Sequence, residues 1–219
     1  MTSKRQKTTM HCELITLGKV YDLSFRLALN IRESRYKPDL IVAIARGGFV
    51  PARFLCDFLN VKDMTAVGVQ HYAPGAVRMK KASVKFPLSA NVYGKSVLIV
   101  DDVNDTGDSL FAAVEHVKTF RPAHLKTAVL HQKETTVFSA DFAAFHVRAW
   151  RWILYPWAVV EDVGSFVARM KPRPKSLAET AARLKKQHSM QVPIRLLEMI
   201  MALQMPARIG TMRIRLSRL

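Results

Sequence analysis

Short apolar runs alternate with amphipathic stretches over the first two thirds of the chain. Residues 40–45 and 97–100 are rich in β-branched side chains and carry no charge, which is typical of strands buried on both faces of a parallel sheet. Residues 19–34 instead carry apolar side chains three and four positions apart, which predicts a helix with one buried face. Further strands are expected at 64–71, 125–131 and 144–154, and further helices at 51–59 and 109–120.

This order of strands and helices predicts an α/β fold, with an open, mostly parallel twisted sheet flanked by helices. We assign residues 13–168 to this domain. Residues 1–12 form a basic N-terminal tail, and residues 169–219 form a basic helical C-terminal extension.

The C-terminal extension begins with a charged, proline-containing linker at residues 171–175, which we expect to be stiff. Two helices are expected after it, at residues 176–186 and 192–203. Ser176 and Glu179 have the spacing of a capping box, which predicts that the first helix begins there.

Composition narrows the class of protein. Hydrophobic residues make up 49% of the 219 residues, enough for a buried core, and no apolar run approaches the length of a membrane span. The two cysteines, Cys12 and Cys56, are too few for a disulfide framework and lack metal-ligand spacing. The first ten residues are polar and basic, so we expect no secretory signal. These features predict a cytoplasmic protein that does not bind membranes.

The net charge of +17 is unevenly distributed. Residues 11–168 carry 19 Lys and Arg against 15 Asp and Glu, whereas residues 169–219 carry 12 against 2. Residues 171–219 could therefore bind a polyanion such as nucleic acid. The alternative that we favour is a solvated or subunit-contacting basic surface.

The segment VLIVDDVNDTGDS, residues 97–109, carries the most specific functional pattern. Its apolar run ends in Asp101 and Asp102, whose carboxylates can accept hydrogen bonds from sugar hydroxyls. Small and hydroxyl side chains follow from Asp105 to Ser109, where a helix is expected to begin. Such a turn offers backbone N–H groups and hydroxyls to a phosphate. The segment therefore predicts a site for a ribose phosphate.

A second anion site is predicted where another buried strand ends. Ala45 closes that strand and is followed by Arg46, Gly47 and Gly48. The two glycines allow the backbone to approach a ligand closely, and the arginine supplies a cation beside them. The helix expected next would direct its positive N-terminus at the same loop.

Residues 97–109 resemble the phosphoribosyl pyrophosphate (PRPP) signature of type I phosphoribosyltransferases. The resemblance implies that Asp101 and Asp102 hold the ribose hydroxyls, with Asp102 also holding Mg²⁺ through water. Asp105 is implied to act near purine N7 as a general base or proton relay, so these three acids are the expected catalytic residues. The 5′-phosphate is expected to be bound by Thr106, Gly107, Asp108 and Ser109, and pyrophosphate by Ala45, Arg46, Gly47 and Gly48.

The segment WILYPW, which begins at Trp152, resembles the Trp-Ile-x-x-Pro-Trp segment of the hypoxanthine and xanthine-guanine branch. The resemblance implies that Trp152 and Ile153 contact the purine, with the indole stacked on it, and that Lys133 donates to purine O6. A lysine ammonium only donates hydrogen bonds, so it suits a 6-oxo group better than the amino group of adenine. The branch usually carries an acid where this chain has Ala158, which leaves the preference for guanine or xanthine open.

Residues 72–87 lie between two expected strands and begin with a segment that breaks regular structure. Their position resembles that of the mobile hood that covers the active site in this family. A solvated basic hairpin is an equal alternative. The cations of this segment are Arg78, Lys80, Lys81 and Lys85.

These resemblances predict an Mg²⁺-dependent enzyme of purine salvage. It would transfer the 5-phosphoribosyl group of PRPP to a 6-oxopurine (hypoxanthine, guanine or xanthine), giving the nucleoside monophosphate and pyrophosphate. The resemblance also implies a homodimer. Two alternatives stay open: adenine as the acceptor, and a purine-sensing regulator that binds nucleic acid through residues 171–219. Similar C-terminal extensions occur in some archaeal members of the family, including relatives that use adenine.

Overall fold

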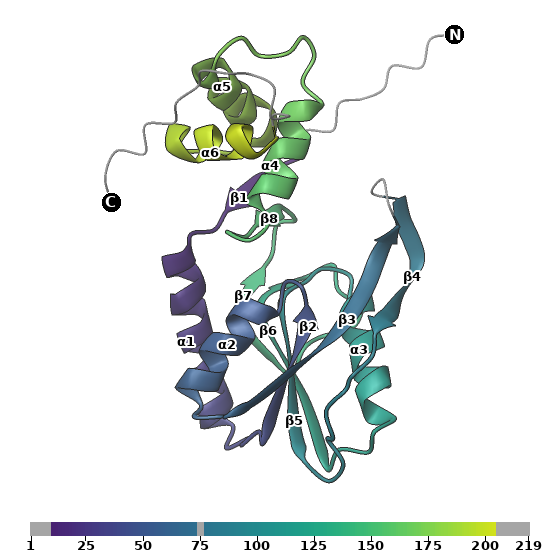
Figure 1. Ribbon diagram of the computed structural model, residues 1–219. Coiled ribbons are helices and arrows are strands. Elements are labelled where there is room, and N and C mark those ends of the chain that lie inside the picture. Colours follow the sequence, from purple (N-terminus) through teal and green to yellow (C-terminus); the bar gives the residue numbers. More distant parts are fainter. Residues whose placement is uncertain (1–9, 74–76, 205–219) are drawn as a thin grey trace. The chain divides into compact units, whose positions relative to one another are not determined.

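The computed structural model describes residues 10–73 and 77–204 (Figure 1). Contacts divide the chain into two compact units. Residues 16–150 form the first, which we call the α/β unit. The segments on either side of it, up to residue 15 and from residue 151, form the second, which we call the terminal unit.

A six-stranded sheet forms the centre of the α/β unit (Figure 1). All neighbouring strands are parallel except the first pair of the spatial order, which is antiparallel. This confirms the predicted open, mostly parallel sheet. In spatial order the strands are β4 (Val77–Phe86), β3 (Asp63–Ala73), β2 (Leu40–Ala45), β5 (Ser96–Asn104), β6 (His124–Lys133) and β7 (Phe142–Val147).

Helices cover both faces of this sheet (Figure 1). Helices α1 (Leu17–Glu33) and α2 (Phe49–Phe58) pack on one face, and α3 (Asp108–Lys118) packs on the other. The predicted stripes are confirmed, because the apolar positions three and four apart are the buried ones. These buried side chains are Val20, Leu23, Leu27 and Ile31 of α1, and Leu110, Ala113, Val114 and Val117 of α3.

Strand β5 packs against helices on both sides of the sheet. Val97 and Ile99 belong to the core beneath α3, whereas Leu98 and Val100 point to the opposite face and are also fully buried. This two-sided burial explains why the strand reads as an uninterrupted apolar run. It continues past the predicted end at residue 100, because its pairing with β6 extends to Asn104.

Residues 77–86 form strand β4, and neither of the two alternatives left by the sequence, a hood or a solvated basic hairpin, is tested by this. Strand β4 runs antiparallel to β3, with register irregularities between Gly68 and Val69 and between Gln70 and Tyr72. The side chains of Arg78, Lys80 and Lys81 lie outside the described residues. A hood function for this segment stays a prediction.

The terminal unit contains a strand from within the range that we predicted as one strand. The prediction of one strand over residues 144–154 is wrong, because β7 ends at Val147 and a separate strand, β8 (Trp152–Leu154), follows. Strand β8 pairs in parallel with β1 (Cys12–Leu14), at the start of the chain. That long-range partner has no signature in the local sequence.

In the described part of the terminal unit, three helices follow β8: α4 (Val159–Ala168), α5 (Leu177–His188) and α6 (Ile194–Gln204). The predicted boundary at residue 168 therefore differs from the division in the structure, which assigns α4 to the same unit as the extension. The physical reason is a shared core, in which Val163 and Val167 of α4 are buried with Leu184 and Leu197.

The start of α5 follows the sequence prediction closely. Ser176 is its N-cap, and its hydroxyl accepts a hydrogen bond from the backbone N–H of Glu179 at 3.1 Å. The carboxylate of Glu179 reaches back one residue further than in a capping box and accepts from the N–H of Lys175 at 2.7 Å. Across residues 10–73 and 77–204, no helix is long and apolar enough to cross a membrane.

Candidate active site

The predicted ligand-binding residues of the α/β unit gather at one edge of its sheet. Strands β2, β5 and β6 are parallel neighbours, so their carboxyl ends lie side by side. Strand β2 ends at Ala45, before the glycine loop, and β5 ends at Asn104, before the turn at 105–109. Strand β6 ends at Lys133 itself. The structure therefore brings together three segments that are far apart in the sequence.

The loop after β2 needs both of its glycines. A Cβ atom added to Gly47 would lie 2.6 Å from the carboxylate carbon of Asp102, and one added to Gly48 would lie 2.8 Å from the carbonyl oxygen of Ile44. A larger residue at Gly48 would require the backbone to move, and one at Gly47 would require the Asp102 side chain to move. The loop includes a cis peptide bond between Ala45 and Arg46, and the arginine is exposed.

Helix α2 begins at this loop, with Gly48 as its N-cap and no side-chain cap among the described residues. Helix α3 begins in the same way at the end of β5, with Gly107 as its N-cap. The N–H groups of a first helical turn have no partner within the helix, so an N-terminus without a side-chain cap is suited to an anion. Two such N-termini follow neighbouring strands.

The adjacent acids at the end of β5 have different surroundings. Alternation along the strand places Asp101 on the α3 side, whereas Asp102 lies against Gly47 on the opposite side. Their exposed fractions are 8% and 9%. The carboxylate of Asp101 accepts from the backbone N–H of Asp102 at 2.9 Å, and that of Asp102 accepts from the N–H of Val103 at 2.7 Å. Burial, together with the charge of Asp102, holds the pKa of Asp101 well above its usual range.

The turn that follows is fixed by contacts with the loop between β6 and β7. Gly107 has a φ of 96°, in the left-handed region, and a Cβ there would lie 2.7 Å from the Cβ of Phe138. The backbone carbonyl of Thr106 accepts a hydrogen bond from the N–H of Val137 at 3.1 Å. The Thr106 hydroxyl donates to the carboxylate of Asp108 at 2.9 Å. Ser109 follows in the first turn of α3 and is half-buried.

Asp105, predicted as a catalytic acid near purine N7, and Lys133, predicted to donate to purine O6, form an ion pair. The Lys133 Nζ donates to Asp105 Oδ2 at 2.7 Å, and the lysine side chain is only 3% exposed. The indole ring of Trp150 covers the ammonium, with 4.6 Å between Nζ and the ring centroid. The indole N–H donates to Asp105 Oδ1 at 3.3 Å. Sequence reasoning missed Trp150, whose one signal is its position two residues before Trp152.

Trp152 and Ile153, the other predicted base contacts, belong to β8 in the terminal unit. The Trp152 indole N–H donates to the carboxylate of Asp162 on α4 at 3.0 Å, and Ile153 is buried. Burial raises the pKa of Asp162, and the charge of Glu161 adds to this, while the hydrogen bond from Trp152 opposes it. Sequence reasoning missed the contact between Trp152 and Asp162, because no local pattern pairs the two.

The acid pair fits a magnesium ion that arrives with its substrate. Mg²⁺ commonly keeps several waters and binds through one or two carboxylates plus substrate phosphates. Asp102 lies against Gly47 in the loop expected to hold pyrophosphate, so its carboxylate could hold such an ion beside the phosphates, whereas Asp101 lies on the opposite side of the strand. Within residues 10–73 and 77–204, no three His, Cys, Asp or Glu side chains gather as a metal site of their own.

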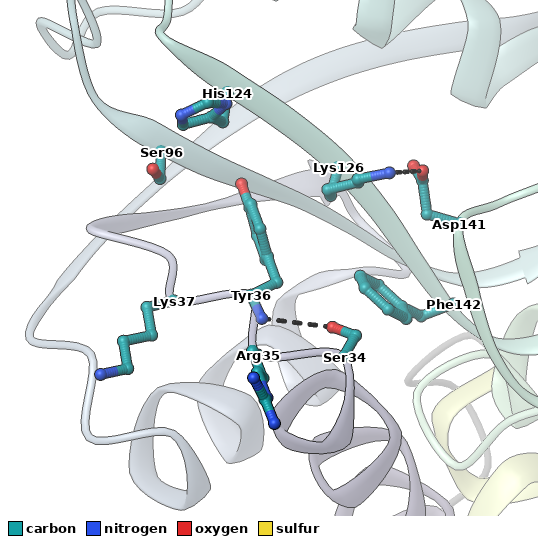
Figure 2. Close-up of a pocket in the computed structure, with 9 residues that line it drawn as sticks. All are labelled: Ser34, Arg35, Tyr36, Lys37, Ser96, His124, Lys126, Asp141 and Phe142. Carbon is teal, nitrogen blue, oxygen red and sulfur yellow. Dashed lines mark hydrogen bonds and ion pairs between the residues drawn. The ribbon is translucent and has the colours of Figure 1, made fainter.

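A cavity of about 560 Å³ lies at the other edge of the sheet, at the amino ends of β5, β6 and β7 (Figure 2). Ser96, His124 and Phe142, the first residues of these strands, line it together with the end of α1. In Figure 2 the ion pair of Lys126 and Asp141 closes one side. No residue predicted to bind PRPP or the purine lines this cavity.

Comparison with known proteins agrees with this geometry. The family model described as "Phosphoribosyl transferase domain" matches residues 14–162. The hypoxanthine-guanine phosphoribosyltransferase of Saccharomyces cerevisiae is 28% identical over 150 residues, which cover 61% of this chain and 67% of the relative. The xanthine-guanine phosphoribosyltransferase of Gluconobacter oxydans is 27% identical over 157 residues, covering 72% of this chain and 90% of the relative.

A solved structure extends the comparison to the fold. The purine phosphoribosyltransferase of Pyrococcus horikoshii is 34% identical to this chain, with a TM-score of 0.58. The match covers 68% of this chain and 94% of that protein. Because the family model spans well over half of the sequence, and includes both loops and the turn described above, the chain belongs to the phosphoribosyltransferase family, in the purine branch of type I.

Proposed function

We propose that the protein transfers the 5-phosphoribosyl group of PRPP to a ring nitrogen of a 6-oxopurine and releases pyrophosphate. The relatives named for hypoxanthine-guanine and xanthine-guanine transfer support this acceptor class. The observation that carries the proposal is the meeting of two anion-binding helix N-termini, an acid pair and the Asp105–Lys133 pair at one edge of the sheet.

The phosphates of PRPP are assigned to the two helix N-termini. Thr106, Gly107, Asp108 and Ser109 bind the 5′-phosphate through backbone N–H groups and hydroxyls, with Asp108 contributing its backbone because its charge repels the anion. Pyrophosphate is assigned to the loop of Ala45, Arg46, Gly47 and Gly48. The close approach that the glycines permit, and the exposed cation of Arg46, support that assignment.

The ribose hydroxyls are assigned to Asp101 and Asp102. Asp102 is the better placed of the two, because its carboxylate lies against Gly47 in the pyrophosphate loop. It is also the residue that would hold hydrated Mg²⁺, through water. When bound with PRPP, the ion would neutralise the pyrophosphate leaving group. Asp101 orients its neighbour by accepting the hydrogen bond from the Asp102 backbone.

The acceptor base is assigned to Lys133 and Asp105. An ammonium has three hydrogens, so Lys133 can donate to purine O6 and still hold Asp105. Asp105 then takes or relays the proton of N7, a contribution to rate of about a hundred- to ten-thousand-fold. Stacking of the purine on Trp152 and its contact with Ile153 stay predictions, and such stacking contributes about 1–3 kcal/mol. Most of the remaining acceleration comes from positioning and from stabilising charge as the C1′–O bond breaks.

A panel of purine bases with PRPP and Mg²⁺ tests the proposal. Wild type is expected to form nucleotide from hypoxanthine, guanine or xanthine, and Asp105→Asn to lose about a hundred-fold or more in kcat. Unchanged activity in the variant would remove the role of Asp105. Adenine as the preferred base would replace the acceptor class, and no PRPP-dependent product from any base would overturn the enzyme assignment. Nucleic-acid binding through residues 171–219 stays a prediction.

Assembly as a homodimer is also proposed, supported by an exposed apolar stripe along α1. Leu17, Tyr21, Phe25 and Leu29 are spaced four apart and each is 41–56% exposed. Soluble monomers rarely leave a contiguous patch of this kind in water. Light scattering on Phe25→Glu tests the proposal. We expect a monomer for the variant and a dimer for wild type, and a dimer for both would exclude this surface.

A further inference from the structure

Lys133 is almost completely buried, although it carries a charge. Its side chain is 3% exposed, and the ammonium meets one carboxylate oxygen of Asp105 at 2.7 Å. A buried ammonium loses much of the hydration that it has in water. The face of the Trp150 ring, 4.6 Å away, is a second favourable contact for this cation.

The same tryptophan also holds the carboxylate. Asp105 Oδ1 accepts from the Trp150 indole N–H at 3.3 Å. The single hydroxyl hydrogen of Thr135 is shared between the Asp105 backbone carbonyl, at 3.0 Å, and Oδ1, at 3.2 Å. The indole N–H on Oδ1 limits the rotation of the carboxylate, and Oδ2 accepts from the ammonium of Lys133. One indole therefore contacts both members of the ion pair, through its face and through its edge.

We propose that Trp150 is a positioning residue for the acceptor base, which holds Lys133 and Asp105 at the separation required by the purine O6 and N7 edge. The inference rests on the proposed function, and it assigns to Trp150 a role distinct from the stacking assigned to Trp152. The indole is 44% exposed, so its other side faces solvent and the contact is not simply core packing. Its loss would leave the lysine open to water and the carboxylate with one donor fewer on Oδ1.

Two variants separate the two contacts. Trp150→Phe keeps an aromatic face for the ammonium and removes the N–H donor, whereas Trp150→Leu removes both. Tyr93→Leu is the control, because Tyr93 is a 70% exposed aromatic in the loop before β5, at the opposite edge of the sheet. Steady-state kinetics are measured with the base and PRPP varied separately.

Trp150→Leu is expected to lower kcat/KM for the base about ten-fold or more, and Trp150→Phe to recover part of that loss. The KM for PRPP is expected to stay within about two-fold of wild type, because the phosphate-binding loops are untouched. Equal losses for both substrates, or no loss in either variant, would overturn the inference. A wild type without turnover would instead overturn the proposed function.

A second measurement is independent of turnover. An amine-reactive reagent followed by peptide mass spectrometry reports the rate at which Lys133 is labelled. We expect slow labelling in wild type and Trp150→Phe, and labelling about ten-fold faster in Trp150→Leu, since the ring that covers the ammonium is gone. Equal labelling of Lys133 in all three proteins would contradict the role of the indole, whatever the activity.

Discussion

Each unit of the chain holds an aspartate against a tryptophan, but the two pairs differ in charge. In the α/β unit, Asp105 accepts from Trp150 and also forms an ion pair with Lys133. In the terminal unit, Asp162 accepts from Trp152, and burial raises the pKa of the acid. The first carboxylate is therefore held by a cation as well as by an indole, beside the loops predicted to bind PRPP. Burial disfavours the charge of the second, which is suited to fixing an indole ring.

The largest expected effect comes from removing the cation of the first pair. Lys133→Met leaves Asp105 without its ion-pair partner and the purine O6 without a donor. We expect kcat/KM for the 6-oxopurine to fall about a hundred-fold or more, because the bound purine O6 is left without a hydrogen-bond donor. Initial-rate assays with the base varied provide the measurement. A loss below about three-fold would show that the ion pair does not serve the base.

Adding one methyl group to the glycine loop after β2 tests how tightly this loop is packed. In Gly48→Ala the new Cβ would lie 2.8 Å from the Ile44 carbonyl oxygen, so the loop must shift. We expect unfolding in urea to show a loss of about 2 kcal/mol, together with weaker PRPP binding. Gly18→Ala in α1 is the matched control, because its Cβ meets nothing closer than 4.0 Å. If both variants unfolded like wild type, the loop would not be as tightly packed as described.

The second pair is tested by leaving its indole without an acceptor. Asp162→Ala removes the partner of the Trp152 N–H, which we expect to lower the free energy of unfolding by about 1–2 kcal/mol, whereas Asp162→Asn keeps an acceptor oxygen. Thermal unfolding of the two variants distinguishes these outcomes. Equal stability of the Ala and Asn variants would mean that the hydrogen bond has no structural role.

The smallest effect is a change in pH dependence. Because the pKa of Asp162 lies above its usual 3.8 in the folded protein, the folded state binds the proton more tightly than the unfolded state. The free energy of unfolding therefore falls as the pH rises from about 4 through the raised pKa. Asp162→Asn should remove this part of the decline, measured by urea unfolding at a series of pH values. An unchanged pH profile would argue against the raised pKa.

The sequence predicts the α/β unit better than the terminal unit. Strands such as residues 40–45 are apolar throughout because helices cover both faces, and α1 shows its buried stripe directly. The pairing of β8 with β1 depends on residues about 140 positions apart, so the apolar run at 144–154 reads as one strand.

In the candidate active site too, the sequence predicts only what depends on neighbouring residues. The turn at 105–109 and the glycine loop have local signatures, because each needs particular residues in consecutive positions. Contacts between residues that are far apart in the sequence have no local signature. Trp150 on the Asp105–Lys133 pair and Asp162 on Trp152 both depend on tertiary structure that no local pattern encodes.

Binding of the PRPP sugar phosphate is assigned to the end of β5 and the start of α3. Calorimetric titration of PRPP with Mg²⁺ into wild type and into the double variant Thr106→Ala/Ser109→Ala tests this assignment. We predict saturable binding to wild type and a Kd at least about ten-fold higher in the variant, at equal thermal stability. The same Kd in both proteins, or no binding to wild type, would contradict the assignment.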